Sequence, residues 1–307
     1  MRLPASIKTI LAALALLPLP LHAQPAPALR QQNETALAKA ATPLEKAIAL
    51  DKLGLFPKAL SILLDDAQLA PDDPAVQLHT AIVLDHNGAH AAARRIYDTL
   101  FARIQTVQQN LARARKSGGT PPAPSATDTR LLALSDLLNE NAAINHVFLG
   151  QYDKALLMFT SIYARIAAYG PDETTNRAAL WRVWLTAKMR ATDGMRSEVA
   201  LETLIASLAV STPWHDAMLK LYLGKLSWEK LLAAMDNNRD DAPARERHTT
   251  EAHFFAAGYF RYVRGDNETA LKLLAAQDSL PYNGVVERLL MRDEIKTLQP
   301  VATPAPR

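Results

Sequence analysis

The stretch Gly-Leu-Phe-Pro-Lys-Ala-Leu (54–60) is followed, 34 residues after its glycine, by Gly-Ala-His-Ala-Ala-Ala (88–93). The arrangement returns as Gly-Gln-Tyr-Asp-Lys-Ala-Leu from Gly150 and as Gly-Asp-Asn-Glu-Thr-Ala-Leu from Gly265. A glycine readily adopts the left-handed conformation that ends a helix. The alanine five positions after each glycine lets the next helix lie close to the preceding one. We therefore expect each glycine to lie at the corner between two antiparallel helices.

This pattern and its 34-residue period resemble the turn and second helix of a tetratricopeptide repeat. The resemblance implies an all-α fold, an α-solenoid of stacked antiparallel helix pairs that forms a tetratricopeptide-like superhelix. Composition agrees, because Ala and Leu dominate the chain and only 6% of its residues are aromatic. Ala and Leu lose little side-chain freedom in a helix, so this mixture favours helices over strands.

Apolar residues at helical spacing extend the pattern along the rest of the chain. We expect helices over residues 34–53, 90–115, 130–149, 152–169, 174–191, 196–210, 214–223, 228–235, 244–263, 268–276 and 285–298. Residues 116–129 are rich in Pro, Gly, Ser and Thr. They are expected to form a flexible loop between the first repeats (34–115) and the later ones (130–298). Flexible ends are expected at 24–33 and 299–307.

The first 23 residues have the pattern of a signal peptide. Arg2 and Lys8 supply positive charge, Ile10 to Leu17 is an apolar run, and Leu-His-Ala ending at Ala23 offers a cleavage site. The apolar run is shorter than the roughly 20 residues that span a bilayer. We expect a periplasmic protein, cleaved near Ala23, with no stable membrane insertion afterwards. A retained N-terminal anchor is the alternative.

The chain contains no cysteine. Disulfides, a thiol nucleophile and bacterial lipidation at a cysteine are therefore all excluded. Without the signal peptide's two basic residues, 32 Lys and Arg of the original 34 remain against 31 Asp and Glu. Because nucleic-acid binding usually requires a clustered basic face, this balanced charge does not favour it.

The C-terminal third carries a narrower pattern. Trp214 leads to Leu-Gly-Lys-Leu-Ser (223–227), followed by Thr-Glu-Ala-His-Phe-Phe-Ala-Ala-Gly-Tyr (250–259) and Leu-Pro-Tyr (280–282). Over 214–298 this succession resembles the C-terminal half of the NlpI family of bacterial envelope lipoproteins. The resemblance implies an envelope adaptor that brings peptidoglycan hydrolases and a protease together, often as a dimer.

Three departures from that family limit what the resemblance implies. The chain lacks the lipidation cysteine, and it carries the loop at 116–129. It also has Ala-Ala-Gly at 256–258, where Tyr-Leu-Gly is usual. We therefore carry over the adaptor role, but neither membrane anchoring nor the particular partners.

Motifs that carry chemistry are missing from the sequence. Lys-Ser-Gly-Gly-Thr (116–120) lacks the order of a phosphate-binding loop, and neither Gly-x-Ser-x-Gly nor His-Glu-x-x-His occurs. His86 and His90 are four residues apart, but a glycine at a predicted helix end separates them. His248 and His253 are five apart, which directs them to different helix faces. We predict no catalytic, cofactor-binding or metal site, and a chain that is not an enzyme.

In a tetratricopeptide array the first helices of successive repeats line a concave groove. Counting back from the corner glycines, we predict a partner-binding groove formed by Leu44, Ile48, Asp51, Lys52, Leu78, Ile82, Asp85, His86, Glu140, Ile144, Val147, Phe148, Phe255, Tyr259 and Tyr262. Apolar residues mixed with few charges suit an extended or helical peptide. The alternative is that flanking helices or the long loop cover these side chains.

Together these features predict a non-catalytic exported adaptor or scaffold that binds a protein or peptide partner in the bacterial cell envelope. The family resemblance adds a link to peptidoglycan hydrolase regulation. An assembly factor of an envelope or secretion complex is the main alternative. A helical scaffold of an envelope enzyme is a further one, although it would need a globular catalytic domain that interrupts the repeats. Monomer and homodimer are both left open.

Overall fold

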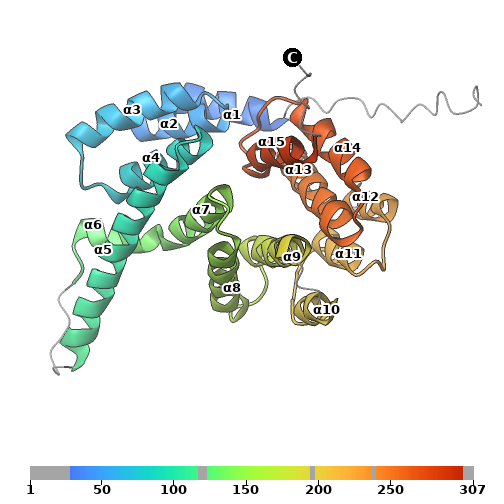
Figure 1. Cartoon of the computed structure of the whole chain (residues 1–307). Helices are drawn as coiled ribbons and strands as arrows, with labels where there is room; N and C mark the ends of the chain where they lie inside the picture. The colour runs from blue at the N-terminus through green and yellow to red at the C-terminus, as the bar shows by residue number, and fades with distance from the viewer. Residues whose placement is uncertain (1–27, 117–122, 194–197, 237–239, 300–307) are drawn as a thin grey trace, which may run out of the picture.

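The computed structural model describes residues 28–116, 123–193, 198–236 and 240–299 (Figure 1). These residues form fifteen α-helices and one π-helical turn, with no strand among them. Consecutive helices pack against one another in sequence order, which confirms the predicted all-α, solenoid-like fold. The predicted signal peptide at 1–23 lies outside the described residues, as do 117–122 of the predicted loop and 300–307 of the predicted tail.

The helices follow the predicted order, but the single helix expected over 34–53 is interrupted between Lys39 and Pro43, and the one expected over 130–149 is interrupted at Leu134. They are α1 (Ala28–Lys39), α2 (Pro43–Lys52), α3 (Phe56–Leu69), α4 (Pro74–His86), α5 (His90–Lys116), α6 (Ala126–Ala133), α7 (Ser135–Phe148), α8 (Tyr152–Ala167), α9 (Glu173–Asp193), α10 (Glu198–Ala206), α11 (Pro213–Tyr222), α12 (Trp228–Asp236), α13 (Ala242–Gly258), η1 (Tyr259–Val263), α14 (Asn267–Asp278) and α15 (Glu287–Leu298). In the described part of the chain, no helix combines the length and the apolar character needed to cross a bilayer.

The four predicted corner glycines lie between α2 and α3, α4 and α5, α7 and α8, and η1 and α14. Their φ angles are +76° at Gly54, +83° at Gly88, +69° at Gly150 and +69° at Gly265, a region that side chains other than glycine rarely adopt. At the first corner the N–H of the residue after the glycine donates to a carbonyl five residues back, at 2.9 Å. This bond ends the helix and turns the chain back, as predicted.

The alanines five positions after these glycines are Ala59, Ala93, Ala155 and Ala270, and all four are completely buried. Their small side chains therefore lie where the two helices of a pair approach each other. A fifth corner, not predicted, occurs at Gly224 between α11 and α12, where φ is +67°. It escapes the pattern because a glutamate rather than an alanine follows five residues later.

The corner at Gly265 differs in one respect, because α13 ends in the π-helical turn η1. There the Asp266 N–H donates to the Phe260 carbonyl, six residues back, at 2.8 Å. The turn also brings Arg261 and Tyr262 onto α15, where both side chains donate to the Glu294 carboxylate. η1 thus ties the last helix pair to the C-terminal helix.

Two predicted flexible segments are partly helical. Residues 28–33, predicted to be a flexible N-terminus, form the start of α1, whose Asn33 is buried and donates to the Lys52 carbonyl. Residues 126–129, predicted to belong to the loop, form the start of α6. This helix start depends on one specific cap, which composition does not reveal: the Ser125 side chain accepts a hydrogen bond from the Asp128 N–H. Arg103 of α5 then pairs with Asp128 at 3.0 Å.

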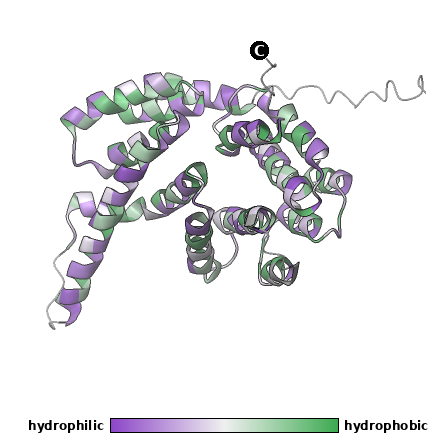
Figure 2. Ribbon diagram, in the orientation of Figure 1, coloured by the Kyte–Doolittle hydropathy of each residue, from purple (hydrophilic) through white to green (hydrophobic). Residues whose placement is uncertain are grey.

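Aromatic residues of α8, α9 and α13 form the centre of the largest core. Trp181 and Trp184 of α9 are buried, and Trp181 stacks on Phe159 with ring centroids 5.4 Å apart. Phe254 of α13 packs on both tryptophans. Apolar residues gather where helices face their neighbours, whereas the far end of α5 is hydrophilic (Figure 2). This core fixes α9 and α13 relative to each other.

The two ends of the solenoid meet, so the helices enclose a central space (Figure 1). α1 packs along α13, and the Leu29 N–H donates to the Glu246 carboxylate at 3.0 Å. In the segment between α14 and α15, Tyr282 packs edge-on against Phe56 at 5.3 Å and lies against His86 at 6.3 Å. The open groove predicted from the repeats is therefore closed, because its first helix and its last connecting segment contact each other.

Candidate functional site

The central space contains a cavity of about 600 Å³ that is partly open to solvent. Its walls are the inner faces of α1, α2, α4, α7, α9 and α13, together with residues 283–287. Amide side chains such as Gln32 and Asn141 alternate there with Ile48, Ile82 and Ile144, and charged groups of both signs lie between them. The cavity therefore offers apolar contacts and hydrogen-bonding groups side by side.

Seven of the fifteen predicted groove residues line this cavity. They are Ile48, Asp51, Lys52, Ile82, His86, Glu140 and Ile144. All belong to the first helices of the helix pairs in the N-terminal half of the chain. His79, three residues before Ile82, also lines the cavity and was not predicted.

The other eight predicted groove residues lie elsewhere. Leu44, Leu78, Val147, Phe255 and Tyr259 pack in the apolar cores, Asp85 is buried between helix pairs, Phe148 stacks on His90, and Tyr262 donates to Glu294. For Leu78 and Asp85 the reason is rotation. Each precedes a cavity residue by one position, and one position turns a side chain by about 100° around a helix.

α13 was misjudged for a different reason. Its C-terminal half is surrounded by α9, α11 and α14, so Phe255 and Tyr259 belong to the core. Only its N-terminal half reaches the cavity, through Arg247 and Glu251. Because the solenoid closes on α1, the cavity lies beside the start of α13 rather than along its whole length.

A buried ion cluster forms one wall of the cavity. Arg177 of α9 lies 2.5 Å from the Glu140 carboxylate, 3.0 Å from that of Glu287 and 3.6 Å from that of Glu251. Glu251 and Glu287 are almost completely buried, whereas 20% of the Glu140 side chain is exposed. Burial alone would lower the pKa of Arg177, but the three carboxylates, Glu140 first, raise it well above its ordinary value. One guanidinium thus holds together α7, α9, α13 and the start of α15.

The Glu251 carboxyl is the least satisfied member of this cluster. Neither of its oxygens accepts a hydrogen bond, although both are buried. Burial raises its pKa to about 8, despite the opposing charge of Arg177, and repulsion from Glu287 adds to the rise. A carboxyl with a strongly shifted pKa beside a cavity is typical of functional sites, although structural ion clusters also produce such shifts.

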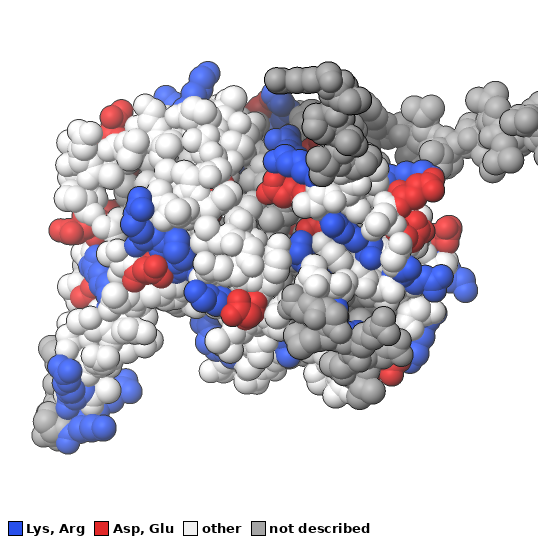
Figure 3. Space-filling model, in the orientation of Figure 1, with Lys and Arg blue, Asp and Glu red and all other residues white. Residues whose placement is uncertain are grey.

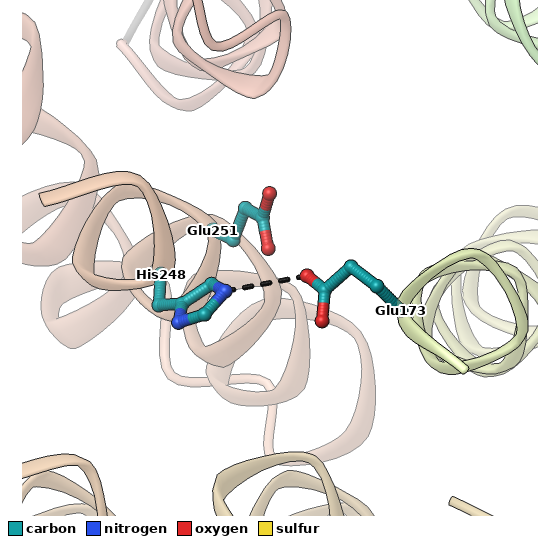
Figure 4. Close-up of side chains that lie close together, drawn as sticks. All are labelled: Glu173, His248 and Glu251. Atoms are coloured by element: carbon teal, nitrogen blue, oxygen red, sulfur yellow. Dashed lines mark hydrogen bonds and ion pairs between the residues drawn. The ribbon is translucent and has the colours of Figure 1, made fainter. Parts of the chain in front are cut away.

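Next to Glu251, His248 lies between two carboxylates (Figure 4). Its Nδ1 is 2.6 Å from the Asp240 carboxylate, and its Nε2 is 3.2 Å from that of Glu173. Burial by itself would lower the pKa of His248, but these carboxylates raise it above its ordinary value. Burial opposes ionisation of Glu173 too, yet its hydrogen bond with His248 lowers the pKa of that carboxyl to about 2.

As predicted, the histidines of the pairs His86/His90 and His248/His253 do not share a helix face. His86 ends α4 and pairs with Asp51 at 2.8 Å, whereas His90 begins α5 and pairs with Asp85 at 3.1 Å. The two histidines therefore point to different carboxylates. His253 lies on a different face of α13 from His248, against the ring of Trp228 at 5.1 Å.

Charged side chains on the outer surface follow a simpler pattern. On the face shown in Figure 3, acidic and basic groups alternate over most of the ring, and basic groups gather at the projecting end of α5. The last turn of α5 contributes Arg113, Arg115 and Lys116 to this end. The basic tip lies away from the cavity, so it is not part of the candidate site.

The cluster around Arg177 could not be found from sequence patterns. Its members come from four elements separated by tens of residues, and no short motif connects them. The one local signal is the pair His248 and Glu251, three residues apart on a single helix face. Comparison with known proteins gives no further guide, because no family model matches this chain and no curated protein matches it either.

Proposed function

We propose that this chain is a non-catalytic exported adaptor of the tetratricopeptide type, similar in role to the NlpI-like envelope proteins. It binds a short polypeptide segment of a partner protein in its central cavity. The observation that supports this proposal is the cavity itself, whose wall combines isoleucines with amides and charges of both signs. Peptide recognition in a groove requires this combination, because the guest presents both backbone groups and side chains.

The cavity's size limits the kind of segment that fits. A helix about 11 Å in diameter with a pitch of 5.4 Å occupies roughly 500 Å³ per turn. A cavity of about 600 Å³ therefore holds about one helical turn or a few extended residues. A chain terminus or a loop tip of the partner fits within the cavity, whereas a longer segment would extend out through its open side.

A paired substitution tests whether the cavity is the binding site. Ile48→Trp places a large ring in the cavity, and Leu157→Trp places the same ring on α8, where Leu157 is 68% exposed. Both proteins, with wild type, are used to capture partners from envelope extract, and captured proteins are quantified by mass spectrometry. We expect a set of proteins that wild type and Leu157→Trp retain and Ile48→Trp loses. Equal capture by both variants would show that another surface binds.

Export is tested separately. N-terminal sequencing of the protein isolated from the periplasmic fraction should begin near Gln24, immediately after the predicted cleavage site. A protein that still begins at Met1 and sediments with the membrane would instead support the retained anchor. Either result leaves the capture experiment interpretable, because that experiment uses the purified chain.

A further inference from the structure

Three side chains with metal-binding atoms converge where α9 meets α13. Glu173 is the first residue of α9, and His248 and Glu251 lie one helical turn apart on α13. One carboxylate oxygen of each glutamate and one ring nitrogen of His248 all lie within 4.8 Å of one another. Figure 4 shows the imidazole and both carboxylates pointing toward a common centre.

The Glu251 carboxylate is the observation that calls for a cation. Its side chain is only 1% exposed, and neither oxygen accepts a hydrogen bond from any described residue. The nearest guanidinium nitrogen, Arg177 Nε, is 3.6 Å away, and Arg177 directs its other nitrogens to Glu140 and Glu287. Without hydrogen-bond donors, this buried carboxyl favours its neutral form, and a cation would replace the proton and stabilise the carboxylate.

The surroundings of His248 have the arrangement found behind metal-bound histidines. A carboxylate on one ring nitrogen fixes the tautomer and directs the other nitrogen toward the metal. Here Asp240 takes the Nδ1 side at 2.6 Å, which leaves Nε2 toward Glu173. With a proton on each ring nitrogen, the imidazolium of His248 donates to both carboxylates. A cation at Nε2 would take the place of the proton between His248 and Glu173.

We propose that Glu173, His248 and Glu251 bind one first-row divalent cation of the Zn²⁺ type, with Asp240 positioning His248. One imidazole and two carboxylates match the ligands that such cations accept. Metal bonds of about 2.0–2.2 Å require the three ligand atoms to move closer together. Glu173 is free to supply this movement, because 44% of its side chain is exposed and it begins its helix.

The proposed cation has a defined place in the fold. It connects the start of α9 to α13, beside the cavity. Three protein ligands leave at least one coordination position for water or another ligand. Because Glu251 lines the cavity, that position opens toward the space in which a partner segment would lie. A sequence pattern does not reveal this site, because two of the three ligands are glutamates and Glu173 lies 75 residues before His248.

Isothermal titration calorimetry of the untagged mature chain with ZnCl₂ tests the site. We expect about one Zn²⁺ per chain, and Glu173→Gln should weaken binding at least about tenfold by removing one ligand. The half-exposed Glu173 is chosen so that the variant keeps its fold, which circular dichroism checks. His253→Asn is the control, because it removes another histidine of α13 that faces Trp228 instead of the cluster.

A second readout uses Co²⁺ in place of Zn²⁺. Bound Co²⁺ should produce visible absorption bands in wild type and His253→Asn, and these bands should be lost in His248→Asn. Failure of the wild type to bind either ion would overturn the proposal. So would equal affinity of wild type and Glu173→Gln, because the ion would then lie elsewhere. Neither result bears on capture of a partner by the cavity, so the two proposals fail independently.

Discussion

Tyr282→Ala should open the ring. Tyr282 is 9% exposed and lies in the segment between α14 and α15, against Phe56 and the corner at Gly54. Replacing a buried aromatic ring with alanine costs about 3–5 kcal/mol through lost contacts and the space left behind. Here the lost contacts are those between the two ends of the solenoid. At about 1.4 kcal/mol per tenfold, closure becomes less favourable by a factor of roughly 10² to 4 × 10³.

Fluorescence energy transfer measures closure directly. The chain has no cysteine, so Lys58→Cys on α3 and Lys272→Cys on α14 introduce unique labelling sites on opposite sides of the contact. Transfer efficiency should fall in the Tyr282→Ala protein, and the urea midpoint of the N-terminal helices should fall with it.

Tyr282→Phe is the matched control. The Tyr282 hydroxyl is buried without a hydrogen-bond partner, so removing it should cost nothing or stabilise the protein by up to about 1 kcal/mol. Transfer should stay at the wild-type value. If alanine leaves transfer and the urea midpoint unchanged, the aromatic contact does not hold the ends together. If phenylalanine is as harmful as alanine, the hydroxyl rather than the ring is responsible.

Three further predictions concern the interior. Gly258→Ala places a Cβ 2.3 Å from Trp184 Cδ1 and so overpacks the core. The free energy of unfolding, measured in urea, should fall by about 1–3 kcal/mol. An unchanged free energy would mean that the tryptophan moves freely. Burial lowers the folded-state pKa of His79 to about 4 from 6.5, so the folded state favours the neutral ring. Stability should therefore fall as pH drops from 6.5 to 4, by up to about 3 kcal/mol, and His79→Leu should reduce this slope in urea titrations at several pH values. Asn145→Ala removes a buried 2.7 Å hydrogen bond to Asp85 and should cost about 2 kcal/mol by thermal or urea unfolding, whereas an unchanged midpoint would show that the bond contributes no net stability.

Much of the fold could be predicted because its rule is local and repeated. A glycine with positive φ that is followed five residues later by a buried alanine identifies a corner between two helices. Four corners of the array have this pattern. The same rule missed Gly224, where the close-packing alanine is absent, and composition missed the first residues of α6 at 126–129, which depend on the Ser125 cap. Local chemistry therefore predicted most helices and failed where a different local signal was used.

The candidate site was only half predictable, because it depends on how the ends of the array meet. Ile48 and Ile82 were correctly placed by counting within their own helices. Phe255 and Tyr259 were placed by the same count, yet they are core residues because neighbouring helices cover that half of α13. Arg177 and its three glutamates converge only in three dimensions. Such convergence leaves no spacing that a single sequence reveals.

The π-helical turn at 259–263 has a consequence for how this sequence should be aligned. At the four other corners, including Gly224, the closing bond spans five residues, but here it spans six. One added residue would rotate everything beyond it by about 100° if the α-helix continued. The wider turn absorbs the addition instead, so α14 still packs on α13. Superposing this unit on its neighbours by a strict residue count would shift its first helix by one place, and a single gap before Gly265 restores the match.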